Sequence, residues 1–322
     1  MMKSKSYVGV FFVLALSILT TLFNSEAAYN GECWVVSNGD TIYKLDSADG
    51  LMDPNGITIP DVSQVQTAEI DPRTGVVWIT VGAANTVFRY DTAAGDFKPI
   101  SGINRPNRTS VNPTDGTIWV GGIDSAYKIA ADGSAILTTV TGLLEPDVSV
   151  NTKDGSCWIT DKRGKIVRYD ANGQPASTPF TLKEPTYVAV NPNTGNVWAT
   201  DTQANILVQL SSSGQELTRT TNYNMPMSPR VNPQDNSLWF ISGSNMLVKL
   251  DASGNELLQV PQAGMAILSL SINSKDGSVW IADQFGSTFT GGVSKYTAAG
   301  QKLLENPVPM PSYVSIGHWT GQ

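Results

Sequence analysis

The sequence contains few of the residues on which common catalytic and metal sites depend. Its 322 residues include one histidine, His318, and two cysteines, Cys33 and Cys157. A single histidine excludes zinc sites built from several histidines, and it leaves the rest of the chain without histidine for acid and base chemistry. The sequence also lacks a glycine-rich phosphate loop, a nucleophile elbow and a Cys-x-x-Cys-His haem site. None of these enzyme classes is indicated.

Basic residues are also in the minority. Lys and Arg number 21 against 28 Asp and Glu, which gives a formal net charge of −7, and no basic run is present. The chain therefore lacks the positive surface that nucleic-acid binding requires, and nucleic acid is not an expected partner. A cationic ligand or partner is compatible with this charge, and so is simple solubility.

What the sequence does contain is a repeat marked by tryptophan. Seven of its eight tryptophans are separated by 39 to 44 residues, namely Trp34, Trp78, Trp119, Trp158, Trp198, Trp239 and Trp280. A fixed period of about 40 residues is the signature of a repeat architecture. The fold is therefore interpreted from the repeat before any local motif.

Each repeat begins with a β-hairpin. The segments 68–78 and 188–198, AEIDPRTGVVW and VAVNPNTGNVW, match almost position by position. In both, an apolar strand is followed by Asp or Asn, Pro, Thr and Gly, which favour a tight turn. A second apolar strand that carries the tryptophan comes next, as expected for a hairpin.

Two further strands complete the repeat. A third strand ends in Tyr or Leu followed by Asp, as in 166–170 and 247–251, and a more variable fourth strand follows a turn with glycine. The tryptophan strand is apolar at consecutive positions, as in 238–241, which is typical of a strand covered on both faces. Four antiparallel strands in about 40 residues correspond to one propeller blade. The predicted fold is all-β, a seven-bladed β-propeller with four-stranded blades.

The two ends of the repeat region complement each other. The chain opens, after its leader, on a tryptophan strand at 31–36 with no first strand before it, and its last segment, 311–321, aligns with 185–195. We predict that residues 312–317 form the innermost strand of the Trp34 blade. This pairing closes the ring and removes two exposed sheet edges.

The repeat resembles known propeller families. The pattern Val-Asn-Pro-x-Thr/Asp-Gly-x-Val-Trp-Ile-Thr-Asp, followed by a strand ending in Arg-Tyr-Asp, looks like the NHL-type repeat and its relatives among virginiamycin B lyases and SMP-30/gluconolactonases, over residues 31–321. The resemblance implies strands around a central channel. It does not imply one activity, because such folds include enzymes and binding platforms. A calcium-dependent lactonase of the SMP-30 type needs no histidine, but Glu32 lies in the wrong part of the blade to match that family's acidic metal ligand near the chain start.

The N-terminus has the pattern of a secretory signal. Lys3 and Lys5 precede an apolar run at 7–23, and small residues follow up to Ala27. A membrane anchor is the alternative, but the run is at the short limit for a span. We predict a signal peptide at 1–27, a single propeller domain at 28–322, no membrane span after cleavage, and a secreted or periplasmic protein.

The cysteines occupy repeat positions. Cys33 and Cys157 each directly precede a repeat tryptophan, where the other blades carry Val, Ile or Leu. By blade order they are three blades apart, farther than a disulfide allows. We predict two free thiols that act as small apolar side chains between blades.

Three carboxylates occupy one repeat position. Asp161, Asp201 and Asp283 each lie three residues after a repeat tryptophan. Such carboxylates around a channel mouth suit calcium, which prefers oxygen ligands. Alternatively, each Asp bonds backbone amides of its own turn. No cofactor is predicted beyond this calcium site.

A second candidate site lies on the predicted innermost strands. At one repeat position, five residues are small, Ser110, Ser149, Ala189, Ser271 and Ser315, as expected for a crowded axis. The exceptions are Glu69 and Arg230, which are predicted to reach into the channel and contact a ligand or each other. Near the channel mouths, further candidate ligand-binding residues are Asn107, Arg108, Asp147, Tyr187 and Tyr313.

Together, these observations favour a non-enzymatic propeller. We expect it to present its channel-mouth loops, where polar pockets form in such folds, to a protein, glycan or small-molecule partner. The alternative is a hydrolase or lyase that uses a metal such as calcium at the channel mouth, as in the SMP-30 lactonases that the repeat resembles.

Overall fold

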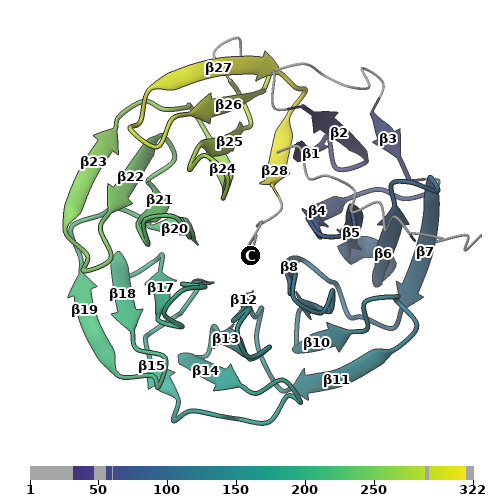
Figure 1. Cartoon of the computed structure of the whole chain (residues 1–322), viewed down its shortest axis with the longest axis horizontal. Helices are drawn as coiled ribbons and strands as arrows, with labels where there is room; N and C mark the ends of the chain where they lie inside the picture. Colours follow the sequence, from purple (N-terminus) through teal and green to yellow (C-terminus); the bar gives the residue numbers. More distant parts are fainter. Residues whose placement is uncertain (1–31, 47–55, 60, 287–289, 317–322) are drawn as a thin grey trace, which may run out of the picture.

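Each repeat folds into one four-stranded antiparallel sheet, and seven such sheets surround a central axis (Figure 1). The computed structural model describes residues 32–46, 56–59, 61–286 and 290–316. The predicted signal peptide and His318 lie outside these residues. The predicted seven-bladed propeller is confirmed.

The seven sheets are numbered here as blades 1 to 7, and their strands run from the channel outward. Blade 1 contains β28 (Pro311–Ser315), β1 (Cys33–Ser37), β2 (Thr41–Leu45) and β3 (Ile57–Thr58). Blade 2 contains β4 (Val65–Ile70), β5 (Val76–Val81), β6 (Thr86–Asp91) and β7 (Asp96–Ser101), with the 3-10 helix η1 (Gly82–Ala84) between β5 and β6. Blade 3 contains β8 (Arg108–Val111), β9 (Ile118–Gly121), β10 (Ser125–Ile129) and β11 (Ile136–Thr141).

The remaining blades follow the same order. Blade 4 contains β12 (Val148–Val150), β13 (Cys157–Asp161), β14 (Lys165–Tyr169) and β15 (Phe180–Thr181). Blade 5 contains β16 (Tyr187–Val190), β17 (Val197–Asp201), β18 (Ile206–Leu210) and β19 (Glu216–Thr220). Blade 6 contains β20 (Met227–Val231), β21 (Leu238–Ser242), β22 (Met246–Leu250) and β23 (Glu256–Val260). Blade 7 contains β24 (Ile267–Ile272), β25 (Val279–Asp283), β26 (Gly292–Tyr296) and β27 (Lys302–Pro307).

The C-terminal strand closes the ring as predicted. β28 is antiparallel to β1, with Ser315 opposite Trp34 and Tyr313 opposite Val36. In Figure 1, the yellow β28 lies beside the purple β1, so the two ends of the repeat region share one blade. Val314 and Ile316 are buried in the cluster that joins blade 7 to blade 1.

The hairpin turns have the chemistry that the sequence indicates. In blade 5, the Asn191 side chain accepts a 2.9 Å hydrogen bond from the Asn193 amide, and Gly195 has a φ of +77°. Glycine adopts this left-handed conformation without steric cost. In blade 6, Asn236 takes the place of the glycine with a φ of +59°, a role that Asn fills more readily than other residues.

The repeat tryptophans form the cores between blades. Each of the seven is 0 to 2% exposed, and each belongs to an apolar cluster with a neighbouring blade. Their structural role is therefore confirmed.

The cysteines are also buried as predicted. Cys33 and Cys157 are free, and they pack in separate apolar clusters. Burial raises the pKa of both thiols, so neither is activated as a nucleophile.

Within the described ranges, no helix is long and apolar enough to cross a membrane.

Candidate functional site

The innermost strands line the channel with two rings of side chains. In the first ring, called the lower ring, each residue is the strand-pairing partner of a repeat tryptophan. Its members are Glu69, Ser110, Ser149, Ala189, Arg230, Ser271 and Ser315. Alternate residues of a strand share one face. The upper ring consists of the residues two positions earlier: Thr67, Arg108, Asp147, Tyr187, Ser228, Ser269 and Tyr313.

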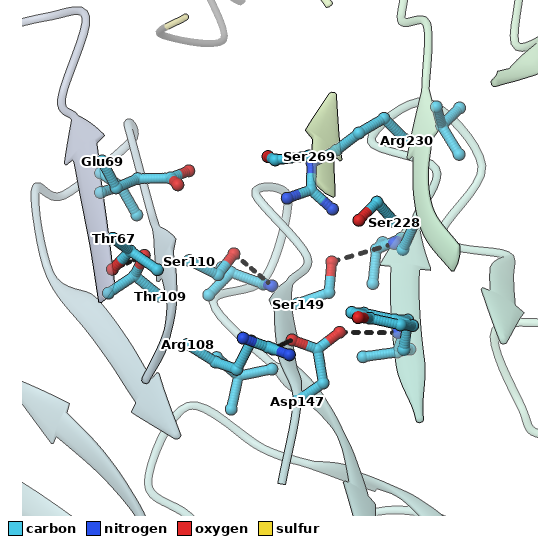
Figure 2. A pocket seen from close by; sticks show the side chains of 18 of the residues that line it. Thr67, Glu69, Arg108, Thr109, Ser110, Asp147, Ser149, Ser228, Arg230 and Ser269 are labelled. Atoms are coloured by element: carbon cyan, nitrogen blue, oxygen red, sulfur yellow. Dashed lines mark hydrogen bonds and ion pairs between the residues drawn. The ribbon is translucent and has the colours of Figure 1, made fainter. Parts of the chain in front are cut away.

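Serines of the lower ring connect neighbouring blades. The hydroxyl oxygens of Ser110, Ser149 and Ser271 each accept a 3.0 Å hydrogen bond from a backbone amide of the next blade, as Figure 2 shows for the first two. Serine recurs here because its hydroxyl makes these bonds. Crowding is not the reason, because the channel holds a cavity of about 230 Å³.

This cavity gathers most of the predicted ligand-binding residues. Residues of all seven innermost strands line it, and they include six of the seven predicted positions: Glu69, Arg108, Asp147, Tyr187, Arg230 and Tyr313. In Figure 2, the side chains of Glu69 and Arg230 point toward each other into the cavity from opposite sides. Both side chains are partly buried.

The Glu69 carboxylate is held by its neighbours. It accepts a 2.6 Å hydrogen bond from the Tyr313 hydroxyl of blade 1. Burial raises the pKa of Glu69, while Arg230 and the Tyr313 hydrogen bond act in the opposite direction. Burial also raises the pKa of Tyr313, and the Glu69 charge raises it further. Tyr313 is therefore a donor to Glu69 at neutral pH.

Arg230 has no ion pair of its own. One of its guanidinium nitrogens, Nη1, donates a 2.9 Å hydrogen bond to the carbonyl of Pro229. Among the described residues, none of the ion pairs within 4.0 Å includes Arg230 or Glu69. Burial tends to lower the pKa of Arg230, but the neighbouring Tyr313 hydroxyl and the negative charges of Glu69 and Asp147 raise it overall. The guanidinium is therefore charged and has free donors.

The other two charged side chains of the cavity, Arg108 and Asp147, form an ion pair with each other. Arg108 Nε lies 3.6 Å from Asp147 Oδ1, and the guanidinium lies 5.3 Å from the centre of the Tyr187 ring. Asp147 Oδ2 accepts a 2.8 Å hydrogen bond from the Val188 amide. Burial raises the pKa of Asp147, and the charge of Arg108 opposes that effect. This pair therefore holds blades 3, 4 and 5 together at the channel.

The seventh predicted residue, Asn107, lies in a neighbouring cavity of about 490 Å³ between blades 2 and 3. Its Oδ1 atom is buried and lacks a hydrogen-bond donor within the described part of the chain. Other amide side chains line the same cavity, and Gln66 lines both cavities.

The three predicted metal ligands are occupied by backbone amides. Asp161 accepts hydrogen bonds from the amides of Leu144 and Arg163, and Asp201 from those of Glu184 and Ala204.

Asp283 accepts in the same way from Met265 and Ala266. Across the residues that the structure describes, no group of three or more His, Cys, Asp and Glu side chains is placed to hold a metal ion. The geometry therefore gives the predicted calcium site no support, and its test is direct metal analysis of the purified protein.

Several residues that line the cavity were not among the predicted site residues. Thr67, Thr109, Ser228 and Ser269 add hydroxyl groups to the wall (Figure 2). Thr67, Ser228 and Ser269 occupy the same repeat position as Arg108 and Tyr313. A comparison of that position across all seven repeats would identify these three residues from the sequence.

The comparisons with known proteins bear on the fold alone. No protein-family model matches the sequence. Among solved structures, the chain is similar to the crystal structure of a functionally unknown protein from Desulfotomaculum acetoxidans DSM 771, with a TM-score of 0.73 and 13% identity. The match covers 89% of this chain and 99% of that one. The class that fold and channel define is therefore a seven-bladed β-propeller.

Proposed function

We propose that this propeller is a binding protein that takes a small polar ligand into its central channel. The observation that carries the proposal is the replacement of two ring serines by Glu69 and Arg230. These two side chains face one cavity and do not form an ion pair. Each replacement removes a serine whose hydroxyl could connect two blades. The Tyr313 hydrogen bond gives Glu69 another contact between blades, whereas the hydrogen bond from Arg230 to Pro229 stays within blade 6.

The cavity has the composition of a ligand site. Charged groups, two tyrosines and several hydroxyls converge on it, and carboxyl groups with raised pKa values are typical of functional sites. A volume of about 230 Å³ is below the roughly 300 to 1,000 Å³ of sites for drug-sized molecules, which supports a small metabolite. A protein or glycan at the mouth would leave the deep charges unexplained.

The wider setting of the proposal comes from the sequence. The resemblance to NHL-type and SMP-30-like repeats supports a channel site, and the N-terminal leader pattern supports an exported protein that meets its ligand in the periplasm or outside the cell.

One observation favours a second candidate function, a hydrolase or lyase that works without a metal. Glu69 and Asp147 are two carboxyl groups with raised pKa values in one cavity, as acid and base catalysts require. If the wild type converts a bound ligand to product and both Glu69→Gln and Asp147→Asn lose this activity, the protein is an enzyme of this kind. If the ligand is recovered unchanged, the binding function is retained.

The test of ligand binding is a thermal-shift screen of a metabolite library against the wild type and the Glu69→Ser/Arg230→Ser variant. We expect ligands that stabilise the wild type and lose their effect on the variant. The variant should fold normally, because serine at these positions can accept hydrogen bonds from the amides of Val111 and Ile272, as Ser149 does from Val190.

The matched control removes the same two residue types from the outer rim. Glu216 and Arg219 form an exposed ion pair on β19, 2.8 Å apart. The Glu216→Ser/Arg219→Ser variant should respond to ligands like the wild type. If every ligand acts equally on the wild type and the channel variant, the channel is not the binding site.

A further inference from the structure

We infer that the channel ligand is a small zwitterion of the amino-acid type, whose carboxylate binds Arg230 and whose ammonium group binds Glu69. This inference rests on the proposed ligand-binding function and adds the chemical class of the ligand.

Only some of the charged side chains in the cavity are free to form an ion pair with a ligand. Four charged side chains line the cavity, and Arg108 and Asp147 are paired with each other. Asp147 also uses its second oxygen to bind a backbone amide. Glu69 and Arg230 each have a hydrogen-bond partner, but neither forms an ion pair within 4.0 Å among the described residues. They are the two charges left for a ligand.

Arg230 is suited to bind a carboxylate. The Arg230 guanidinium has five N–H donors, of which one binds the Pro229 carbonyl, and Figure 2 shows the group directed into the cavity. A planar guanidinium matches a carboxylate with two parallel hydrogen bonds. Attraction from nearby negative groups keeps Arg230 charged. A carboxylate is therefore the complementary ligand group.

Glu69 is suited to bind an ammonium group. The Tyr313 hydroxyl donates to one oxygen of Glu69 and orients the carboxylate. An ionised carboxylate has about four acceptor positions, so it can accept further hydrogen bonds from a ligand. Among charged ligand groups, an ammonium supplies donors and also offsets the negative charge that burial disfavours at Glu69.

The net charge of the cavity restricts the charge of its ligand. The four charged side chains of the cavity sum to zero, so a neutral dipolar ligand leaves the cavity neutral. A dicarboxylate would place one negative group beside Glu69, and a diamine would place one positive group beside Arg230. Like charges repel strongly in a buried site. The structure therefore favours one group of each sign.

The test is isothermal titration at pH 7.5 and low salt with linear amino acids from glycine to 6-aminohexanoate. The series covers a range of separations between the two charged groups. Matched linear monocarboxylates, amines and dicarboxylates of each chain length are titrated in parallel. At the best length, we expect the zwitterion to bind at least tenfold more tightly than each matched compound.

Single variants test which residue binds each charged end of the ligand. Arg230→Gln should lower zwitterion affinity at least tenfold. Glu69→Gln should remove the advantage of the zwitterion over the monocarboxylate and should not weaken monocarboxylate binding, because a negative charge is removed from the cavity. The Glu216→Gln/Arg219→Gln variant on the rim should behave as the wild type.

The outcomes separate this inference from the proposed function. Equal binding of zwitterion and dicarboxylate would overturn the role of Glu69 as the ammonium site. Failure of the whole series, together with a different ligand from the library screen that depends on Glu69 and Arg230, would overturn the zwitterion and keep the channel as a binding site. Failure of both experiments would overturn both.

Discussion

The Tyr313 hydroxyl donates a 2.6 Å hydrogen bond to Glu69, across 244 positions of sequence. Tyr313 lies on β28, the strand that closes the ring, and Glu69 lies on the innermost strand of blade 2. The strand that completes blade 1 therefore also positions one of the two free charges of the cavity. Ring closure and the candidate site depend on the same segment.

Removing the C-terminal strand should open the ring. A chain truncated before Pro311 lacks β28 and the buried side chains of Val314 and Ile316, and it exposes the edge of β1. We expect a large loss of stability in thermal unfolding followed by circular dichroism. Tyr313→Phe, which keeps the strand, is the control and should retain most of the stability. A truncated chain that melts like the full chain would disprove closure by β28.

The repeat tryptophans should each make a large contribution to stability. Trp198 is 1% exposed in the cluster between blades 5 and 6. We expect Trp198→Ala to lower the free energy of unfolding by about 3 to 5 kcal/mol, because it leaves a cavity. Denaturant unfolding measures this loss. Leu217→Ala, at a side chain that is 52% exposed, is the matched control and should change stability little.

Each serine hydrogen bond between blades should make a measurable contribution to stability, and a new serine at the same ring position should add such a bond. Ser149→Ala removes the bond to the Val190 amide and should cost about 1 kcal/mol in denaturant unfolding. Ala189 occupies the same ring position in blade 5, where the equivalent amide of the next blade belongs to Val231. Ala189→Ser should therefore stabilise the protein. A neutral result for both variants would remove the hydrogen-bond explanation of the ring.

The environment of Glu69 should make stability depend on pH. Burial raises the pKa of Glu69 above its unfolded value, so the folded state binds more protons between these two values. The contribution of this group to stability therefore falls as pH rises through that window. We expect Glu69→Gln to raise the melting temperature by about 1 to 3 °C at pH 8 and to have no effect at pH 3.

The control for this pH dependence is Glu216, whose pKa is shifted in the opposite direction. The hydrogen bond from Arg219 lowers the pKa of Glu216, so Glu216→Gln should not stabilise the protein at pH 8. Equal effects of the two substitutions at both pH values would show that Glu69 is in an ordinary environment.

The fold was predictable because its information is local and repeated. The Asn191 turn and the Trp198 strand lie within a few residues of each other, and a similar local pattern occurs in blades 2 to 7. Closure followed from the complementary ends, because Tyr313 aligns with Tyr187. The candidate residues Glu69 and Arg230 were also predictable, since each breaks the repeat at a known position.

The interactions of the site were less predictable, because they join different blades. The bond between Ser149 and Val190 connects innermost strands of two repeats, and their relative offset depends on how blades pack. The same holds for Tyr313 and Glu69. A single repeat contains no information on that offset, so the serines were first interpreted as small residues at a crowded axis.

The most direct test of ligand binding in the channel is a crystal structure with the tightest ligand from the screens. The proposal predicts ligand density in the cavity, with polar atoms within about 3.5 Å of both Arg230 and Glu69. Ligand density on the outer rim, or in the channel without contact to either side chain, would contradict it.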